Sequence, residues 1–205
     1  ISDPSTPVAA GSIAGDENTN NLSYSKGISS SVISGSTYAL TISDNEGIQI
    51  LNISDPSVPV IVSSLDDTDN TNFARAKAIT SVAIGNSIYA LTASSTEGFQ
   101  IINISDPANP SISGSLADTA DPADENMLEI VSMSSVGIGS STYALIASPI
   151  KGLQIINISD PENPAIASSL TDTADTKLGN ASAISTVEIG TNLYALIASE
   201  NEPGD

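Results

Sequence analysis

Short runs of apolar and β-branched residues alternate with polar, turn-forming residues along the whole chain. In the clearest stretch the apolar runs are residues 59–65, 79–85, 87–94 and 98–104. The second and third runs flank a Gly-Asn pair, which is typical of a β-hairpin. The helical spacing of 3.6 residues is missing, so the stretch predicts four strands and no helix.

The same pattern is repeated through the chain. The peptide Ile-Ser-Asp-Pro occurs four times, at intervals of 52, 51 and 54 residues, and a hairpin glycine followed by a Tyr-Ala-Leu strand also occurs four times. A period of this length is typical of propellers and solenoids. We therefore expect one domain, residues 1–205, built of four repeats of about 51 residues. The repeats are predicted to span residues 1–52, 53–103, 104–157 and 158–205.

One strand of the repeat is apolar on both faces. Ile101 and Ile102 are neighbours in such a strand, so their side chains point to opposite sides of the sheet. Ile155 and Ile156 repeat the arrangement. A sheet that is buried on both sides has to lie between other sheets, as the blades of a propeller do. The sequence therefore predicts an all-β fold, a β-propeller with four-stranded blades.

One strand of the predicted ring is missing. Four repeats should contain four strands that begin with glycine and continue with an apolar residue, Gln and Ile, but only three are present, beginning at Gly47, Gly98 and Gly152. One blade is therefore predicted to lack a strand within this chain, which leaves an exposed sheet edge. Three explanations remain open: a three-stranded final blade, a cut from a larger ring, or a strand supplied by another molecule.

The charge of the chain excludes some classes of binding partner. The formal net charge is −19, with only five Lys and Arg residues. Nucleic acid and anionic membranes are bound through clustered basic residues, so neither is expected. No apolar run reaches about eighteen residues, and no membrane insertion is expected. The chain begins at Ile1 without Met or a signal-peptide pattern, so we expect it to be part of a longer product.

Cysteine and histidine are both absent from the sequence. Without cysteine, disulfides and thiolate metal sites are impossible. Without histidine, the chain lacks the commonest general base and the commonest transition-metal ligand, so an enzyme would have to use carboxylates alone. The repeats single out no pair of carboxylates for that work, and we expect no enzymatic activity.

Acidic loops in the later repeats are candidates for calcium binding. Closely spaced Asp, Asn and Thr oxygens suit Ca²⁺, which takes six to eight oxygen ligands. The EF-hand spacing is not met, and the alternative is a solvated loop whose Asp and Thr side chains satisfy its own turns. The candidate ligands are Asp67, Asp69, Asn70, Asp118, Asp121, Asp172 and Asp175.

Other recurring polar residues have structural interpretations. An Asp before Pro at a strand end is ordinarily a turn former, and the Asn that begins each Asn-Ile-Ser is predicted to cap the same turn. Recurring tyrosines are expected to pack between blades rather than to form a binding ring. Asn180 begins a further sequon, in a loop, and is the accessible candidate for glycosylation. The recurring residues are Asp55, Asp106, Asp160, Asn52, Asn103, Asn157, Tyr38, Tyr89, Tyr143 and Tyr194.

The segment Gly-Phe-Gln-Ile-Ile-Asn-Ile-Ser-Asp-Pro-Ala-Asn-Pro at residues 98–110, together with the Tyr-Ala-Leu strand, resembles the LVIVD repeat family. The resemblance covers essentially the whole chain, although Asn stands at residues 52, 103 and 157 where the family more often has Asp. It implies a β-propeller, typically on secreted or surface proteins of bacteria and archaea. It brings no established catalytic residues.

Together these features predict a non-enzymatic extracellular or cell-surface module for adhesion or structural assembly. Its partners would be copies of itself or other surface proteins, and strand exchange between subunits would build a filament or a surface array. The alternative is a propeller that binds calcium or carbohydrate. A propeller hydrolase such as a lactonase is a third hypothesis, and without histidine it would need a site made of carboxylates.

Overall fold

The computed structural model describes residues 5–6, 8–13, 22–43, 47–68, 73–117, 130–173 and 175–200. Within these ranges the chain forms fourteen strands and no helix, so the predicted all-β class is confirmed. None of the described residues belongs to a helix that could cross a membrane.

The strands form antiparallel sheets in which each strand pairs with its neighbour in the sequence. The first sheet contains β1 (Ser25–Ile33), β2 (Ser36–Ser43), β3 (Gly47–Asn52) and β4 (Val60–Leu65). The second contains β5 (Ala76–Ile84), β6 (Ser87–Ser94), β7 (Gly98–Asn103) and β8 (Ser111–Leu116). The third contains β9 (Ser132–Ile138), β10 (Ser141–Ser148), β11 (Gly152–Asn157) and β12 (Ala165–Leu170). The fourth contains β13 (Ala181–Ile189) and β14 (Asn192–Ser199).

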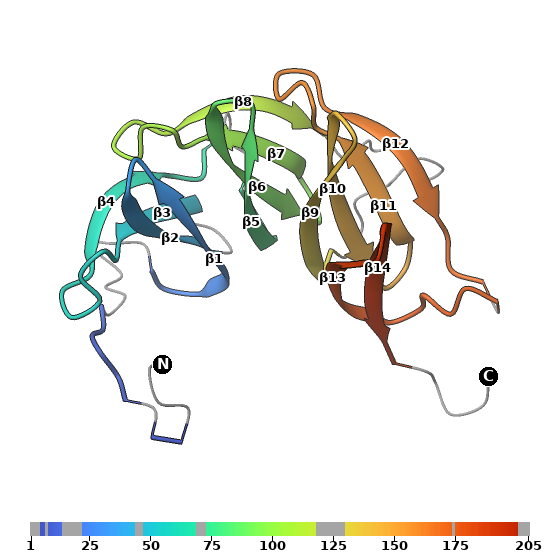
Figure 1. The fold of residues 1–205 in the computed structure, drawn as a ribbon, viewed down its shortest axis with the longest axis horizontal. Helices are drawn as coiled ribbons and strands as arrows, with labels where there is room; N and C mark the ends of the chain where they lie inside the picture. The colour runs from blue at the N-terminus through green and yellow to red at the C-terminus, as the bar shows by residue number, and fades with distance from the viewer. Residues whose placement is uncertain are drawn as a thin grey trace.

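The four sheets are arranged as the blades of a propeller, side by side along an open arc (Figure 1). The first strands β1, β5, β9 and β13 line the inside of the arc, and each packs against the next. The fourth strands β4, β8 and β12 lie on its outside. The first and fourth sheets occupy opposite ends of the arc. The predicted propeller fold is therefore confirmed, as an arc with two free ends.

Glycines at two recurring positions allow the tight connections within each blade. Gly85 lies in the hairpin turn between β5 and β6 with a φ of 61°, a conformation that disfavours residues with a Cβ. Gly47 begins β3 with a φ of 83°, and a Cβ there would collide with the carbonyl oxygen of Leu65. Glycine is therefore needed in the hairpin turn because of its backbone conformation. At the start of the third strand it is needed for its conformation and also because a Cβ has no room.

Each blade has two apolar faces, which we name by the neighbour that they contact. The forward face looks toward the next blade along the chain, and the rear face toward the preceding one. The forward face of the first blade carries Leu40, Ile42, Ile48 and Ile50, and the rear face of the second carries Ile79, Ala90, Ile102 and Ile104. These two sets form one buried cluster. Ile101, on the forward face of the second blade, packs in the next cluster, so burial on both faces is confirmed.

The blades are not the same segments of chain as the sequence repeats. The repeat 53–103 begins with β4, but β4 pairs with β3 and so completes the first blade. The glycine-led strand, which is the last strand of its repeat, is thus the third strand of its blade, and the Ile-Ser-Asp-Pro turn joins the third strand to the fourth. For the same reason β12 belongs to the third blade. Among the described residues the last blade therefore has two strands, where the sequence predicted a shortfall of one.

Candidate functional site

The recurring Asn, Ser and Asp side chains hold the turn between the third and fourth strands. In the second blade, Asn103 Oδ1 accepts a hydrogen bond from the Ser105 N–H at 2.9 Å, and Ser105 Oγ accepts one from the Ile88 N–H at 3.0 Å. Asp106 Oδ1 then accepts from the Ala108 N–H at 3.1 Å. The first and third blades repeat these bonds. The predicted turn-forming role of these residues is confirmed.

Two of the turn carboxylates are held in their charged form. Hydrogen bonds from the Ser57 hydroxyl and then from its N–H lower the pKa of Asp55 below 3.8. The Asn109 amide and then the Ala108 N–H lower the pKa of Asp106 in the same way. Donors that point at a carboxylate stabilise the anion. The hydrogen bonds that close these turns therefore also favour the ionised form of both carboxylates.

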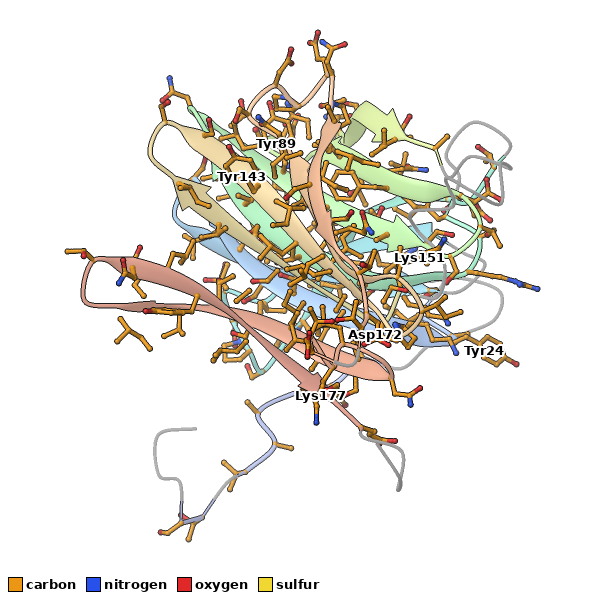
Figure 2. The ribbon with its side chains drawn as sticks, turned by 90° about the vertical axis from the view of Figure 1, so that its right-hand side faces the viewer. Tyr24, Tyr89, Tyr143, Lys151, Asp172 and Lys177 are labelled. Atoms are coloured by element: carbon orange, nitrogen blue, oxygen red, sulfur yellow. The ribbon has the colours of Figure 1, made fainter. Side chains whose placement is uncertain are left out.

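The recurring tyrosines have the predicted packing role in the three complete blades. Tyr38, Tyr89 and Tyr143 each pack against a core cluster between blades. Tyr89 and Tyr143 lie at the same end of their blades (Figure 2). Tyr194 differs and is 45% exposed, because none of the described strands covers the forward face of the last sheet.

Two of the predicted calcium ligands bind backbone groups of their own loops. Asp67 Oδ1 accepts a hydrogen bond from the Phe73 N–H at 2.6 Å. Asp172 Oδ1 accepts from the Leu178 and Gly179 N–H groups, both at 2.7 Å. Each aspartate follows the fourth strand of its blade. Its hydrogen bonds tie the loop to residues that lie just before the first strand of the next blade. Such bonds are what the solvated-loop alternative predicts.

The remaining candidate ligands are placed as follows. Asp175 is exposed in the same loop as Asp172. Asp69, Asn70, Asp118 and Asp121 lie outside the described residues. Among the residues that are described, no three acidic, Cys or His side chains gather as a metal cluster. Calcium binding stays a prediction.

Asn180, the candidate glycosylation site, is exposed immediately before β13. It has a φ of 53°, and Tyr24 and Arg75 have φ values of 58° and 55° at the equivalent position before β1 and β5. Asn tolerates this left-handed conformation better than most residues. Glycosylation stays a prediction.

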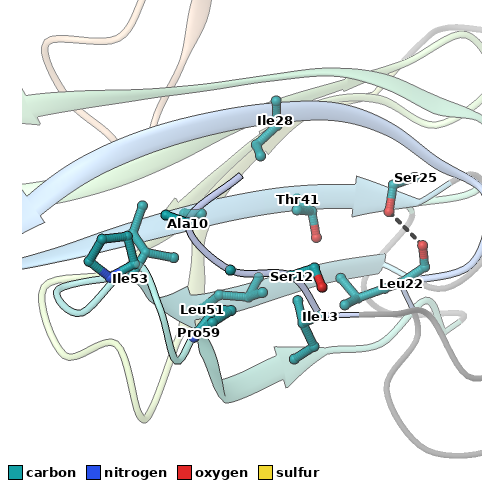
Figure 3. A pocket seen from close by; sticks show the side chains of 13 residues that line it. Ala10, Ser12, Ile13, Leu22, Ser25, Ile28, Thr41, Leu51, Ile53 and Pro59 are labelled. Atoms are coloured by element: carbon teal, nitrogen blue, oxygen red, sulfur yellow. Dashed lines mark hydrogen bonds between the residues drawn. The ribbon is translucent and has the colours of Figure 1, made fainter. Parts of the chain in front are cut away.

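One free end of the arc is a groove on the rear face of the first blade. The groove has a volume of about 480 Å³. Its floor is the rear face of β1, β2 and β3, and its wall is the segment 8–13 (Figure 3). Ile28 in this groove is 72% exposed, whereas Ile79, at the same position in the second blade, is 8% exposed. The floor lining comprises Leu22, Ser25, Ile28, Ala39, Thr41, Leu51 and Ile53.

The segment 8–13 occupies the place of a fourth strand from a blade before the first. A Cβ on Gly11 would collide with the carbonyl oxygen of Pro56, and one on Gly114 in β8 with that of Pro161. At the same position of β4, Ser63 Oγ donates to the Pro107 carbonyl oxygen at 2.6 Å. In all three cases the outer strand of one blade touches the turn of the next. Segment 8–13 therefore lies against the turn of the first blade in the same way as β8 lies against the turn of the third.

The other free end is the two-stranded sheet of β13 and β14, at the near side of the molecule in Figure 2. Its rear face packs on the third blade through Ile184 and Ile197. Its forward face is open: Leu196 is 55% exposed, whereas Leu91 at the same position in the second blade is fully buried. In the described part of the chain, β14 pairs only with β13. The arc thus ends in an apolar face and an unpaired strand edge.

Sequence reasoning predicted the missing glycine-led strand and an exposed sheet edge, but it predicted neither segment 8–13 as a strand counterpart nor the groove on the rear face of the first blade. The signal for segment 8–13 was present, because Ile-Ser-Asp-Pro-Ser-x-Pro precedes both residue 8 and residue 60. It identifies residues 8–13 as a counterpart of β4. The groove had no such signal, since its floor has the same kinds of residue as a buried blade face.

Comparison with known proteins supports the fold. The family model for the LVIVD repeat matches residues 28–67, 81–118 and 139–172, more than half of the chain. Each match lies in a different four-stranded blade, and the third match begins just after β9. Comparison with curated proteins gives no match.

Several solved structures are similar. A thermostable family-43 glycoside hydrolase has a TM-score of 0.57 at 9% identity, over 90% of this chain and 67% of that one. An alpha-L-arabinofuranosidase from Lactobacillus brevis has a TM-score of 0.55 at 13% identity, over 88% and 66%. One from Clostridium thermocellum ATCC 27405 has a TM-score of 0.51 at 14% identity, over 83% and 60%. This chain spans about two thirds of their length, and at such identities the likeness shows the fold alone.

Proposed function

Because the chain belongs to the LVIVD repeat family, we propose that it is a non-enzymatic extracellular or cell-surface module for adhesion or structural assembly. Assembly proceeds by addition of a β-strand at the free end of the arc. The partners are further copies of this protein or other surface proteins that carry the same repeat.

The observation that carries this proposal is the outer edge of β14, which pairs with no third strand among the described residues. In each complete blade, the second strand pairs on one side with the first strand and on the other with the glycine-led third strand. The pairing is the same each time: Tyr89 lies opposite Asn103, and Ser94 opposite Gly98. In β14, Tyr194 and Ser199 hold these positions, and β13 is the strand that pairs with it. Main-chain hydrogen bonds at such an edge supply affinity, and alternate side chains supply specificity.

Two further features support a role without catalysis. The carboxylates that recur in the three complete blades, such as Asp55 and Asp106, accept hydrogen bonds from their own turns. A net charge of −19 keeps an extended, repeat-built surface in solution and repels other acidic molecules until a specific contact forms.

The test is complementation by a strand in trans. A labelled peptide with the sequence of residues 98–110 is titrated into the protein, and hydrogen exchange of the β14 amides is followed. We expect binding, slower exchange in residues 192–199 and a raised melting temperature, because the peptide completes the sheet. The matched control carries Gln100→Pro and Ile101→Pro, which removes an N–H on each side of the strand. Equal binding of the two peptides would contradict the proposal.

A second candidate function is binding of carbohydrate, and the similar structures are what favour it. The solved structures with a similar fold are described as glycoside hydrolases and arabinofuranosidases. Screening the protein against arabinose- and xylose-containing oligosaccharides by calorimetry tests this candidate. No heat of binding at millimolar sugar would remove it.

Calcium binding belongs to the same alternative and has its own test. If Asp67 and Asp172 help to hold Ca²⁺, removal of the ion by a chelator lowers the melting temperature, and added Ca²⁺ restores it. An unchanged melting temperature would count against calcium and in favour of loops closed by their own hydrogen bonds.

A further inference from the structure

The groove at one end of the arc has the surface of an ordinary blade interface that lacks its partner. Each apolar residue of its floor has a counterpart at the same position of the second blade, where the forward face of the first blade covers it. Ile28 corresponds to Ile79, Leu51 to Ile102 and Ile53 to Ile104. Leu22, before β1, corresponds to Phe73, before β5. These four counterparts are buried in the cluster between the first two blades. The groove is therefore shaped to receive the forward face of a blade.

The opposite end of the arc presents such a face, and no described residue of the chain forms a blade against it. Tyr194 and Leu196 of β14 lie at the positions of Tyr89 and Leu91 in β6, as the hairpin pairing shows. Ala183 of β13 likewise lies at the position of Ala78. Ala78 and Leu91 are buried against the third blade, and Tyr89 packs beside them. Ala183 and Leu196 are exposed.

From this complementarity we infer that the groove over the rear face of β1–β3 is the seat for the β13–β14 hairpin of a second copy. The inference rests on the proposed role in assembly and names the surface and the occupant. The two surfaces already pack together three times within one copy, with the same residue types at the same strand positions. The contact between copies continues that interface by one further blade.

The seated hairpin produces a defined junction blade. β13 and β14 of one copy supply its first and second strands, and segment 8–13 of the other supplies its fourth. One strand position lies between them, next to the free edge of β14. This is the position of the glycine-led strand, so strand addition at β14 and seating of the hairpin complete the same blade.

The contact is head-to-tail, because different surfaces of each copy meet. A heterologous contact of this kind closes into a ring if the rotation between copies allows it and otherwise continues as a filament. Each copy carries a net charge of −19, so repulsion opposes the contact at low ionic strength. Salt at about 0.5–1 M shortens the screening length to a few ångströms and should strengthen association.

Engineered disulfide cross-linking tests the inference directly, since the chain contains no cysteine. A Cβ at Gly27 of β1 would lie 3.2 Å from Ile79 Cγ2, so these two positions face each other between the first and second blades. Across the junction the equivalent positions are Ala183 of one copy and Ile28 of the other. Positions whose side chains touch in this way can bring two Cβ atoms to the roughly 3.5–4.5 Å that a disulfide requires. We therefore combine Ala183→Cys protein with Ile28→Cys protein under mild oxidation.

We expect a disulfide-linked heterodimer in the mixture, increased by salt, and much less dimer with either variant alone. The double variant Gly27→Cys and Ile79→Cys is the positive control, because it should cross-link within one copy. Assembly seen by sedimentation without the Ile28–Ala183 cross-link would overturn this seat and leave the proposed assembly role intact. A protein that stays monomeric in 1 M salt and also fails to bind the peptide 98–110 would overturn both.

Discussion

At the scale of single residues, the recurring polar side chains act locally. Asn103 Oδ1 accepts a hydrogen bond from the N–H two residues ahead, and Ser105 Oγ accepts one from the N–H of Ile88, the second residue of the neighbouring strand β6. The turn is thus closed by short-range bonds and tied to the blade by one longer-range bond. This explains why Asn, Ser and Asp recur together, since the three side chains satisfy successive backbone groups of one turn.

Replacing the turn asparagine tests this account. Asn103→Ala removes the acceptor for the Ser105 N–H, and we expect a loss of about 1 kcal/mol in the free energy of unfolding. Asn103→Asp keeps an acceptor oxygen at the same place and should remain close to the wild type. Urea denaturation of the three proteins measures the difference. Equal loss in both variants would mean that the hydrogen bond is not the cause.

The turn carboxylates predict a pH dependence with a defined sign. The pKa of Asp106 in the folded protein is lowered from 3.8, so its charged form stabilises the fold. This stabilisation is present above pH 3.8 and is lost as the pH falls through the lower folded pKa. Asp106→Asn should therefore be less stable than the wild type at pH 7, and the gap should narrow toward pH 2.5. Urea midpoints at several pH values give the comparison, and a constant gap would contradict it.

At the scale of strands, identical sequences have different surroundings. Tyr-Ala-Leu forms part of β2, β6, β10 and β14, but its leucine is fully buried in β6 and 55% exposed in β14. The difference arises because the third blade covers the forward face of β6, whereas no strand in the described part of the chain covers the forward face of β14. The strand sequence is thus suited to a contact that the last blade does not make within one copy.

Matched truncations of these leucines should differ strongly in cost. Leu91→Ala empties a closed cluster between two blades, and we expect a loss of about 2–5 kcal/mol in the free energy of unfolding. Leu196→Ala removes a half-exposed side chain and should cost about 0.5 kcal/mol in the monomer. Denaturation at low protein concentration and low salt keeps association out of the measurement. A large loss in Leu196→Ala under these conditions would show that its forward face is already covered.

At the scale of the whole molecule, the arc has two unlike ends that fit each other. One end is a groove with a rear face as its floor and segment 8–13 as its wall, and the other is the open forward face of β13 and β14. Blades stabilise one another through face-to-face contacts, as repeats do in other stacked proteins. An arc with both terminal faces open leaves apolar surface in water and favours further stacking.

A charge placed on the terminal face should prevent that stacking. Leu196→Asp adds a carboxylate to the surface that enters the groove, so we expect association in high salt to fall by tenfold or more. Ile150→Asp is the matched control, because Ile150 is 54% exposed in the β10–β11 connection of the third blade and belongs neither to the groove lining nor to the β13–β14 sheet. Sedimentation equilibrium in 1 M salt measures both. Equal effects of the two substitutions would place the contact elsewhere.

The sequence predicted the local elements well, because each of them depends on neighbouring residues. The hairpin at Gly85, the third strand beginning at Gly98 and the turn at Asp106 were all predicted from nearby residues. Their turns, alternation and capping bonds act within a few positions of the chain. The propeller fold followed from one more local fact, the apolar character of both Ile101 and Ile102.

The blade boundaries and the candidate site depend on distant pairings that no local pattern carries. The pairing of β4 with β3 assigns residues 60–65 to the first blade. The close approach of Gly11 to Pro56 places segment 8–13 beside that blade, as the counterpart of a fourth strand from a preceding one. Burial is decided in the same way, because Ile28 and Ile79 have the same strand position and differ only in what stands beside them. The sequence by itself therefore determined the repeat, the strands and their turns. Tertiary structure alone decided which faces are left open, because exposure depends on the neighbour and not on the residue.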